Sequence, residues 1–186
     1  MKNRLLPGLL GLLVSSGALA DVEARLKEMG VELYPHSEPS NPFVPVVQTG
    51  NLAFTAGHGP KKPDGSYLIG RLGDDLTVAQ GAEAARLSGI AILSSLKHQL
   101  GDLDRIKRFV KVLGMVNATE DFTQHSQVIN GFSELILEAF GEKGRHARSA
   151  VGMQSLPIGF ATEIEVVVEL HSNETAGEKA ADPVDP

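Results

Sequence analysis

The chain has 186 residues, of which 42% are hydrophobic and 22% are charged, a composition typical of one globular domain with a single core. Its formal net charge is -6, and no basic run is longer than Lys61-Lys62, so it lacks the positive surface that nucleic-acid binding requires. Cysteine is absent, which excludes disulfides, thiolate metal sites and a cysteine nucleophile. We therefore expect one acidic domain that does not bind nucleic acid.

Both ends of the chain are predicted to lie outside this domain. Residues 1–20 have the layout of a secretory signal peptide, with Lys2 and Arg4 before an apolar run and alanines at both positions of an A-x-A cleavage site. The alternatives are a buried helix and a membrane anchor, but the apolar run is shorter than the ~20 residues that span a bilayer. We predict cleavage after Ala20, a periplasmic or secreted protein, and no membrane association after cleavage. Residues 172–186 are polar and acidic and predict a disordered tail.

Residues 21–171 alternate between helix and strand patterns and predict a single domain. The expected elements are a helix over 22–29, a proline-rich connector over 35–45, strands over 46–49 and 52–57, a helix from Thr77 to about Leu100, a strand over 106–116, a helix closed by Gly141, and strands over 144–153 and 162–170. Asp121 followed by Gln124 resembles a capping box for the third helix. This order predicts an α+β fold with two long helices on one face of a mixed sheet.

The last two predicted strands carry the sharpest chemical signal. Arg148 lies among small and apolar residues, and Glu163 begins a strand in which acidic and apolar residues alternate. We interpret these as neighbouring strands whose arginine and carboxylates share one site. Arginine binds a carboxylate through two parallel hydrogen bonds, and a glutamate can position a water. Alternatively, Arg148 forms only a structural ion pair with Glu163 or Glu165, or Glu163 is one of several solvated acids.

The histidines give a weaker signal. The six are scattered without the close spacing of a zinc site, so we expect no metal. His58 and His146 differ from the others because both lie beside the predicted site strands. Each either lines the cleft and titrates near neutral pH, or has a plain surface role. Ser149 lacks the surroundings of a nucleophilic serine and is expected to pair within the sheet.

Several short motifs occur in the order in which the Rid (YjgF-like) family carries them. They are Thr55-Ala56-Gly57, Val116-Asn117-Ala118-Thr119 followed by Asp121-Phe122, Asn130, Ala147-Arg148-Ser149-Ala150-Val151, Leu156-Pro157 and Glu163-Ile164-Glu165. From about residue 22 to 170 the sequence thus resembles this family, and in particular the branch labelled endoribonuclease L-PSP or chorismate-mutase-like. The resemblance implies a chorismate-mutase-like fold, a homotrimer, and sites in clefts between subunits.

The resemblance also implies an activity. The best-known members hydrolyse 2-imino and enamino acids to 2-keto acids and ammonia without a cofactor. This implies a cofactor-free enamine or imine deaminase that acts on a small carboxylate-bearing metabolite. The implied roles are carboxylate binding by Arg148, water positioning by Glu163, backbone contacts near Gly57 and Ala150, and a polar lining from Asn130 and, in one interpretation, His58. The family usually has a tyrosine where this chain has Val46, so the substrate-facing ring is absent or replaced by Phe43.

Two other functions compete with the deaminase. Export weakens the deaminase interpretation, because the enzymes that generate such reactive intermediates are generally cytoplasmic. A non-catalytic protein that binds small keto or amino acids through Arg148 would explain the same residues. The endoribonuclease suggested by the label of the branch is disfavoured by the acidic charge balance.

Overall fold

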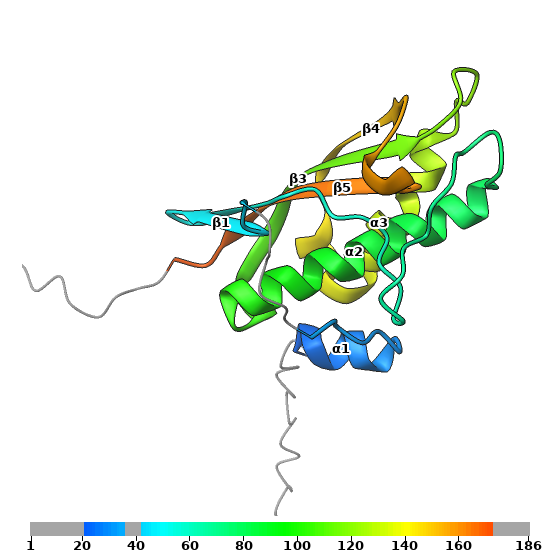
Figure 1. Cartoon of the computed structure of the whole chain (residues 1–186). Helices are drawn as coiled ribbons and strands as arrows, with labels where there is room; N and C mark the ends of the chain where they lie inside the picture. Colours follow the sequence, from blue (N-terminus) through cyan, green and yellow to red (C-terminus); the bar gives the residue numbers. More distant parts are fainter. Residues whose placement is uncertain (1–20, 36–41, 173–186) are drawn as a thin grey trace, which may run out of the picture.

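The computed structural model describes residues 21–35 and 42–172. The predicted signal peptide and nearly all of the predicted tail lie outside these residues. The described elements are α1 (Val22–Glu28), β1 (Val46–Thr49), β2 (Leu52–Thr55), α2 (Val78–Leu100), β3 (Ile106–Asn117), α3 (His125–Phe140), β4 (Ala147–Met153) and β5 (Thr162–Leu170), with short 3-10 turns between some of them (Figure 1). The expected α+β fold is confirmed. None of the described helices is long and apolar enough to cross a membrane.

The two long helices begin in different ways. At the start of α2, the predicted cap Thr77 forms a capping box with Gln80, each side chain accepting a hydrogen bond from the backbone N–H of the other. Gly101 ends α2 in a left-handed conformation with φ of 79°. The capping box expected at Asp121 is wrong. Asp121 lies in a turn before α3, and Gln124 itself takes the N-cap position without a side-chain hydrogen bond to the helix.

The strands form one sheet in the order β1-β2-β5-β3-β4. Only β3 and β4 run parallel, and the other neighbours are antiparallel. Our expectation that β4 and β5 are neighbours is wrong, because β3 lies between them. The connection through α3 returns the chain parallel to β3 and places β4 on the outer edge. Residues 154–161 then carry the chain past β3, so that β5 fills the gap between β2 and β3.

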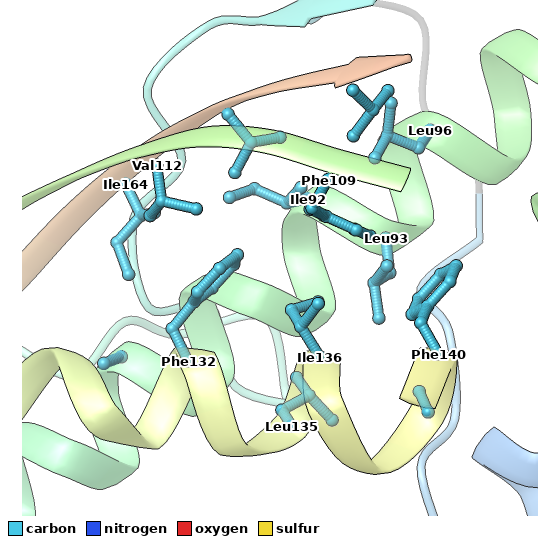
Figure 2. Close-up of a cluster of buried hydrophobic side chains, with 14 of the residues drawn as sticks. Ile92, Leu93, Leu96, Phe109, Val112, Phe132, Leu135, Ile136, Phe140 and Ile164 are labelled. Carbon is cyan, nitrogen blue, oxygen red and sulfur yellow. The ribbon is translucent and has the colours of Figure 1, made fainter. Parts of the chain in front are cut away.

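The helices α2 and α3 pack on one face of the sheet, as predicted, and enclose the hydrophobic core (Figures 1 and 2). Alternate strand residues face this layer, so Val112 on β3 and Ile164 on β5 are fully buried. They meet Ile92, Leu93 and Leu96 of α2 and Phe132, Ile136 and Phe140 of α3.

Among residues 21–35 and 42–172, no helix lies over the opposite face of the sheet (Figure 1). We call it the open face. It carries a shallow hollow of about 350 Å³, lined by Phe54, Lys111, Leu113, Glu165 and Val167 among others. Phe54 and its cross-strand neighbour Val47 are 41% and 54% exposed. An apolar sheet face of this kind is normally covered by another layer.

Candidate functional site

Arg148 points from the edge strand β4 toward the helix layer. Its strand partner is Val112, whose buried side chain faces the helices, and paired residues share a face of the sheet. The guanidinium donates three hydrogen bonds to the first turns of α3. Nη1 bonds Asn130 Oδ1 at 3.0 Å and Ser133 Oγ at 2.9 Å, and Nη2 bonds the Ser126 carbonyl oxygen at 3.3 Å. The structure therefore brings Arg148 and the predicted residue Asn130 together.

The charge of Arg148 is not neutralised by a carboxylate. All three of its acceptors are uncharged, and within residues 21–35 and 42–172 it forms no ion pair. The structural ion pair with Glu163 or Glu165 that we considered is absent there. Partial burial lowers the pKa of Arg148 below its ordinary value, which reflects the cost of holding this charge away from water. An incoming carboxylate would offset that cost.

His146 and Ser133 support the position of Arg148 through a chain of hydrogen bonds. His146 Nδ1 lies 2.6 Å from the Gly144 carbonyl oxygen, so Nδ1 carries the hydrogen. Nε2 is then an acceptor for the Ser133 hydroxyl at 3.1 Å, while Ser133 Oγ accepts from Arg148. Burial lowers the pKa of His146, and the charge of Arg148 lowers it further. Neutral His146 thereby fixes the direction of the hydroxyl that receives the arginine.

Ser133 and Ser126 were missed by the sequence analysis. A usable signal exists in the spacing, because Ser126, Asn130 and Ser133 are four and three residues apart and so share one face of a helix. That pattern would have indicated a polar stripe on an otherwise apolar helix.

Glu163 lies on the open face. Its partner on β3 is Met115, and along β5 the residues alternate between buried and more exposed, with Glu163, Glu165 and Glu169 on the more exposed side. A Cβ atom on Gly57 would stand only 2.0 Å from Glu163 Oε1, so only a glycine leaves room for this carboxylate. Burial raises the pKa of Glu163, and the charge of Glu165 raises it further. Gly57 and Glu163 are therefore brought together, as a second cluster.

Arg148 and Glu163 do not share a site within one chain. β3 separates their strands, and their side chains leave the sheet on opposite faces. Neighbouring strands are about 4.8 Å apart, so the two residues are separated by roughly 10 Å of sheet in addition to facing opposite ways. The predicted shared site is thus wrong for a single subunit.

The remaining predicted site residues, Ala150, His58 and Val46, make contacts within the fold. Ala150 lies two residues after Arg148 on the same side of β4 and packs against the core. His58 is largely buried, with its ring nitrogens 2.8 Å from the Ala56 carbonyl oxygen and 2.8 Å from Ser95 Oγ, and burial lowers its pKa. These two contacts connect the end of β2 to α2. Val46 is 5% exposed and belongs to the core, so its side chain does not face a ligand in this chain.

No three metal-binding side chains gather in a cluster within the described residues. The described residues form two polar clusters, one at Arg148 and one at Glu163. Residues 23–170 match the family described as "YjgF/chorismate_mutase-like, putative endoribonuclease", and the chain belongs to this family.

Known proteins agree with this assignment. Protein TCP17 from Trypanosoma cruzi is 42% identical over 160 residues, which cover 86% of this chain and 98% of that protein. The crystal structure of Atu1372 from Agrobacterium tumefaciens, a protein of unknown function, has 41% identity, covers 81% of this chain and 94% of its own, and gives a TM-score of 0.74. A structure from Shewanella oneidensis described as "a putative endoribonuclease" has 32% identity, coverages of 81% and 99%, and a TM-score of 0.77. The predicted family and fold are confirmed.

Proposed function

We propose that this protein is a cofactor-free deaminase that hydrolyses 2-imino or enamino acids to 2-keto acids and ammonia. The observation that carries the proposal is the half-buried guanidinium of Arg148, which is held in place by uncharged acceptors and has no carboxylate partner among the described residues. Such a group is suited to the carboxylate of a small substrate.

In the proposed reaction, a water attacks C2 of the imine, so that a C–O bond forms and the C=N bond becomes a single bond. Glu163 as a carboxylate positions the water and accepts its proton. The protonated acid returns that proton to nitrogen, which gives a carbinolamine. The proton of the new hydroxyl then passes through Glu163 to nitrogen as the C=O bond forms and the C–N bond breaks, and ammonia leaves the keto acid. The raised pKa of Glu163 favours this exchange, because an acid that holds its proton nearer to neutral pH both accepts and donates it more readily.

We propose further that one site is built from two subunits of a homotrimer. Arg148 lies at the sheet edge and Glu163 on the open face, so a second copy must bring its edge to this face if both are to reach one substrate. The exposed Val47 and Phe54 and the hollow beside Leu113 support such packing. Closed symmetric assemblies are the usual result of this kind of contact.

A second candidate is a binding protein without turnover. It is favoured by the separation of Arg148 from Glu163 within one chain, which leaves the arginine site with a carboxylate clamp but without an acid to position water. Both candidates require Arg148 to bind the ligand carboxylate, and they differ only in the need for Glu163.

The two candidates are separated by measuring imine decay. An amino-acid oxidase generates the imino acid in solution, and its disappearance is followed with wild type, Arg148→Ala and Glu163→Gln. We expect Arg148→Ala to lower kcat/KM by about tenfold to a hundredfold, because charge-assisted hydrogen bonds contribute ~1.5–3 kcal/mol. Glu163→Gln should lower kcat by ~10² or more, as loss of a general acid-base group does.

Arg145→Ala is the matched control. Arg145 is three residues before Arg148 and forms a surface ion pair with Glu142, so this variant also removes one arginine charge. If the wild type binds 2-keto acids through Arg148 but does not accelerate imine decay, the protein is a binder and not a deaminase. If neither binding nor decay depends on Arg148, both candidates fail. Cleavage of RNA that survives Arg148→Ala and repeated chromatography would point to the endoribonuclease instead.

We also propose that the mature protein is exported. The support is the sequence of residues 1–20 alone. Mass spectrometry of the protein from its native host tests this, and an intact Met1 would contradict it.

A further inference from the structure

We propose that the chain has a second ligand site, a pocket beside Arg71 that binds a small organic monocarboxylate. The pocket has a volume of about 580 Å³, within the range of small-molecule sites, and is lined by Arg71, Ala118, Thr119, Glu120, Phe122, His125, Gly152, Met153 and Gln154. It lies where β3 and β4, the parallel strands, both end. The carboxyl ends of parallel strands are a frequent place for ligand sites.

This pocket is separate from the arginine site. Arg148 is not among its lining residues. Gly152 is four residues beyond Arg148 on β4, and at the rise of a strand this places it ~13 Å away. A ligand in the Arg71 pocket therefore need not contact the guanidinium of Arg148.

Arg71 has a fixed backbone and an unused side chain. Its N–H donates to Asp75 Oδ1, and its carbonyl oxygen accepts from the N–H groups of Asp75 and Leu76 at 3.2 and 3.1 Å. By contrast, its guanidinium forms no hydrogen bond or ion pair within residues 21–35 and 42–172, and its Nε is buried there without a partner. A guanidinium whose Nη groups have no acceptor among these residues is suited to bind a carboxylate in the pocket.

The start of α3 adds further donors. Its N-cap residue Gln124 forms no side-chain hydrogen bond to the helix, so the first-turn N–H groups have no side-chain acceptor there. His125 from this turn lines the pocket, and its ring stacks edge-on against Phe122 at 5.2 Å. A Cβ on Gly152 would stand 2.4 Å from His125 Nε2, so the glycine lets the ring lie against β4. The helix start, with its partial positive charge, thus faces the same space as Arg71.

The lining also selects the kind of anion. Glu120 at the exposed rim is the acidic group of the pocket and offsets part of the positive charge, which disfavours a dianion such as phosphate. Phe122 and Met153 give the pocket apolar walls for a short carbon chain. A monocarboxylate with a small aliphatic part matches both features.

The test is a titration with butyrate, followed by NMR of the backbone amides. It is carried out in the full chain carrying Arg148→Ala, so that the other arginine does not contribute. We expect shifts in residues 119–127 and 152–154, and a loss of affinity of about tenfold or more in the double variant with Arg71→Gln, which removes the charge-assisted hydrogen bonds. Arg86→Gln on α2, outside the pocket lining, is the matched control and should leave the affinity unchanged.

Several outcomes would overturn the proposal. They are an absence of shifts at these residues, shifts that persist at equal affinity in Arg71→Gln, and inorganic phosphate binding as tightly as butyrate. If Arg71→Gln does not fold, protection of Arg71 from phenylglyoxal by butyrate, measured by mass spectrometry, decides the question in its place. Because hydrolysis of imino acids is expected to be unchanged in Arg71→Gln, the result does not depend on the proposed deaminase.

Discussion

The partly buried position of Glu163 beside Glu165 lowers the free energy of unfolding at neutral pH. Burial and the charge of Glu165 raise the pKa of Glu163, so the folded chain binds this proton more tightly than the unfolded chain does. At neutral pH the ionised carboxylate therefore destabilises the fold, and the penalty disappears as the pH falls below the folded pKa.

We accordingly expect Glu163→Gln to raise the melting temperature at about pH 7, and expect the gain to shrink at about pH 4, where the wild-type acid is protonated. Thermal unfolding followed by circular dichroism measures this. The control is Glu134→Gln, an exposed position on α3, which should have little effect at either pH. A melting temperature that falls in Glu163→Gln would contradict the assignment.

For two partly buried histidines we expect the free energy of unfolding to depend on pH in the direction opposite to that for Glu163. Burial lowers the pKa of both His58 and His146, so the unfolded chain binds more protons than the folded chain near the ordinary histidine pKa. The free energy of unfolding should be highest above that value and should fall as the solution becomes more acidic.

Urea unfolding between about pH 7.5 and pH 5.5 measures this loss. In His58→Gln the free energy of unfolding should change less with pH than in wild type, because His58 is more deeply buried than His146. His171→Gln, an exposed position after β5, is the control and should leave the slope unchanged. An equal slope in wild type and His58→Gln would show that this imidazole does not titrate with folding.

At this scale the sequence predicted residue types better than partners. Arg148 and Asn130 were both singled out from motifs, and the structure places them in contact. Ser133 was missed because its signal is only its spacing from Ser126 and Asn130 on one face of the helix, and it belongs to none of the motifs used. Val46 was named as a ligand contact because it stands where the family usually has a tyrosine, but in this chain its side chain belongs to the core.

Glycines set the distance between α2 and α3. A Cβ on Gly131 of α3 would stand 2.0 Å from the carbonyl oxygen of Ala82 on α2, which is backbone and cannot turn aside. A Cβ on Gly89 of α2 would instead meet the side-chain ends of Leu135 and Phe132 at 2.9 and 3.0 Å. The first contact is rigid, and the second can relax.

We expect Gly131→Ala to destabilise the protein by ~1–3 kcal/mol or more, as overpacking does. In Gly89→Ala the smaller clash is partly offset by the higher helix propensity of alanine, which contributes up to ~1 kcal/mol. Chemical denaturation of both variants gives the comparison. If the two lose equal stability, the backbone contact at Ala82 does not limit the approach of the helices.

The elements themselves were predictable, and their order in the sheet was not. Thr77 and the helical period located α2, because these signals act within a few residues. Strands that follow each other usually pair, and this favoured β4 beside β5. The crossover through α3 places β4 parallel to β3 at the edge of the sheet, and β5 pairs with the other side of β3 and with β2 instead of with β4.

For the whole molecule, the proposed homotrimer with a site built from two subunits makes a quantitative prediction. Trimers of Arg148→Ala alone and trimers of Glu163→Gln alone are each expected to keep about a tenth of the wild-type activity or less. In trimers assembled from an equal mixture, a site that takes Arg148 from one subunit and Glu163 from another has both native residues in about one case in four.

We therefore expect the mixture to recover roughly a quarter of the wild-type activity after joint refolding. Mixing the folded variants without refolding is the control and should recover nothing while the subunits do not exchange. Failure to recover activity after joint refolding would place both residues in one subunit, or would remove one of them from the reaction.

The position of β5 also has a consequence for how the protein is made. β5 is the last strand of the domain to be synthesised, yet it lies at the centre of the sheet and pairs with both β2 and β3. Until these nine residues have left the ribosome, the hairpin of β1 and β2 and the unit formed by β3, α3 and β4 each have an unpaired edge. The nascent chain must therefore remain open to chaperones or to aggregation until its final strand closes the sheet.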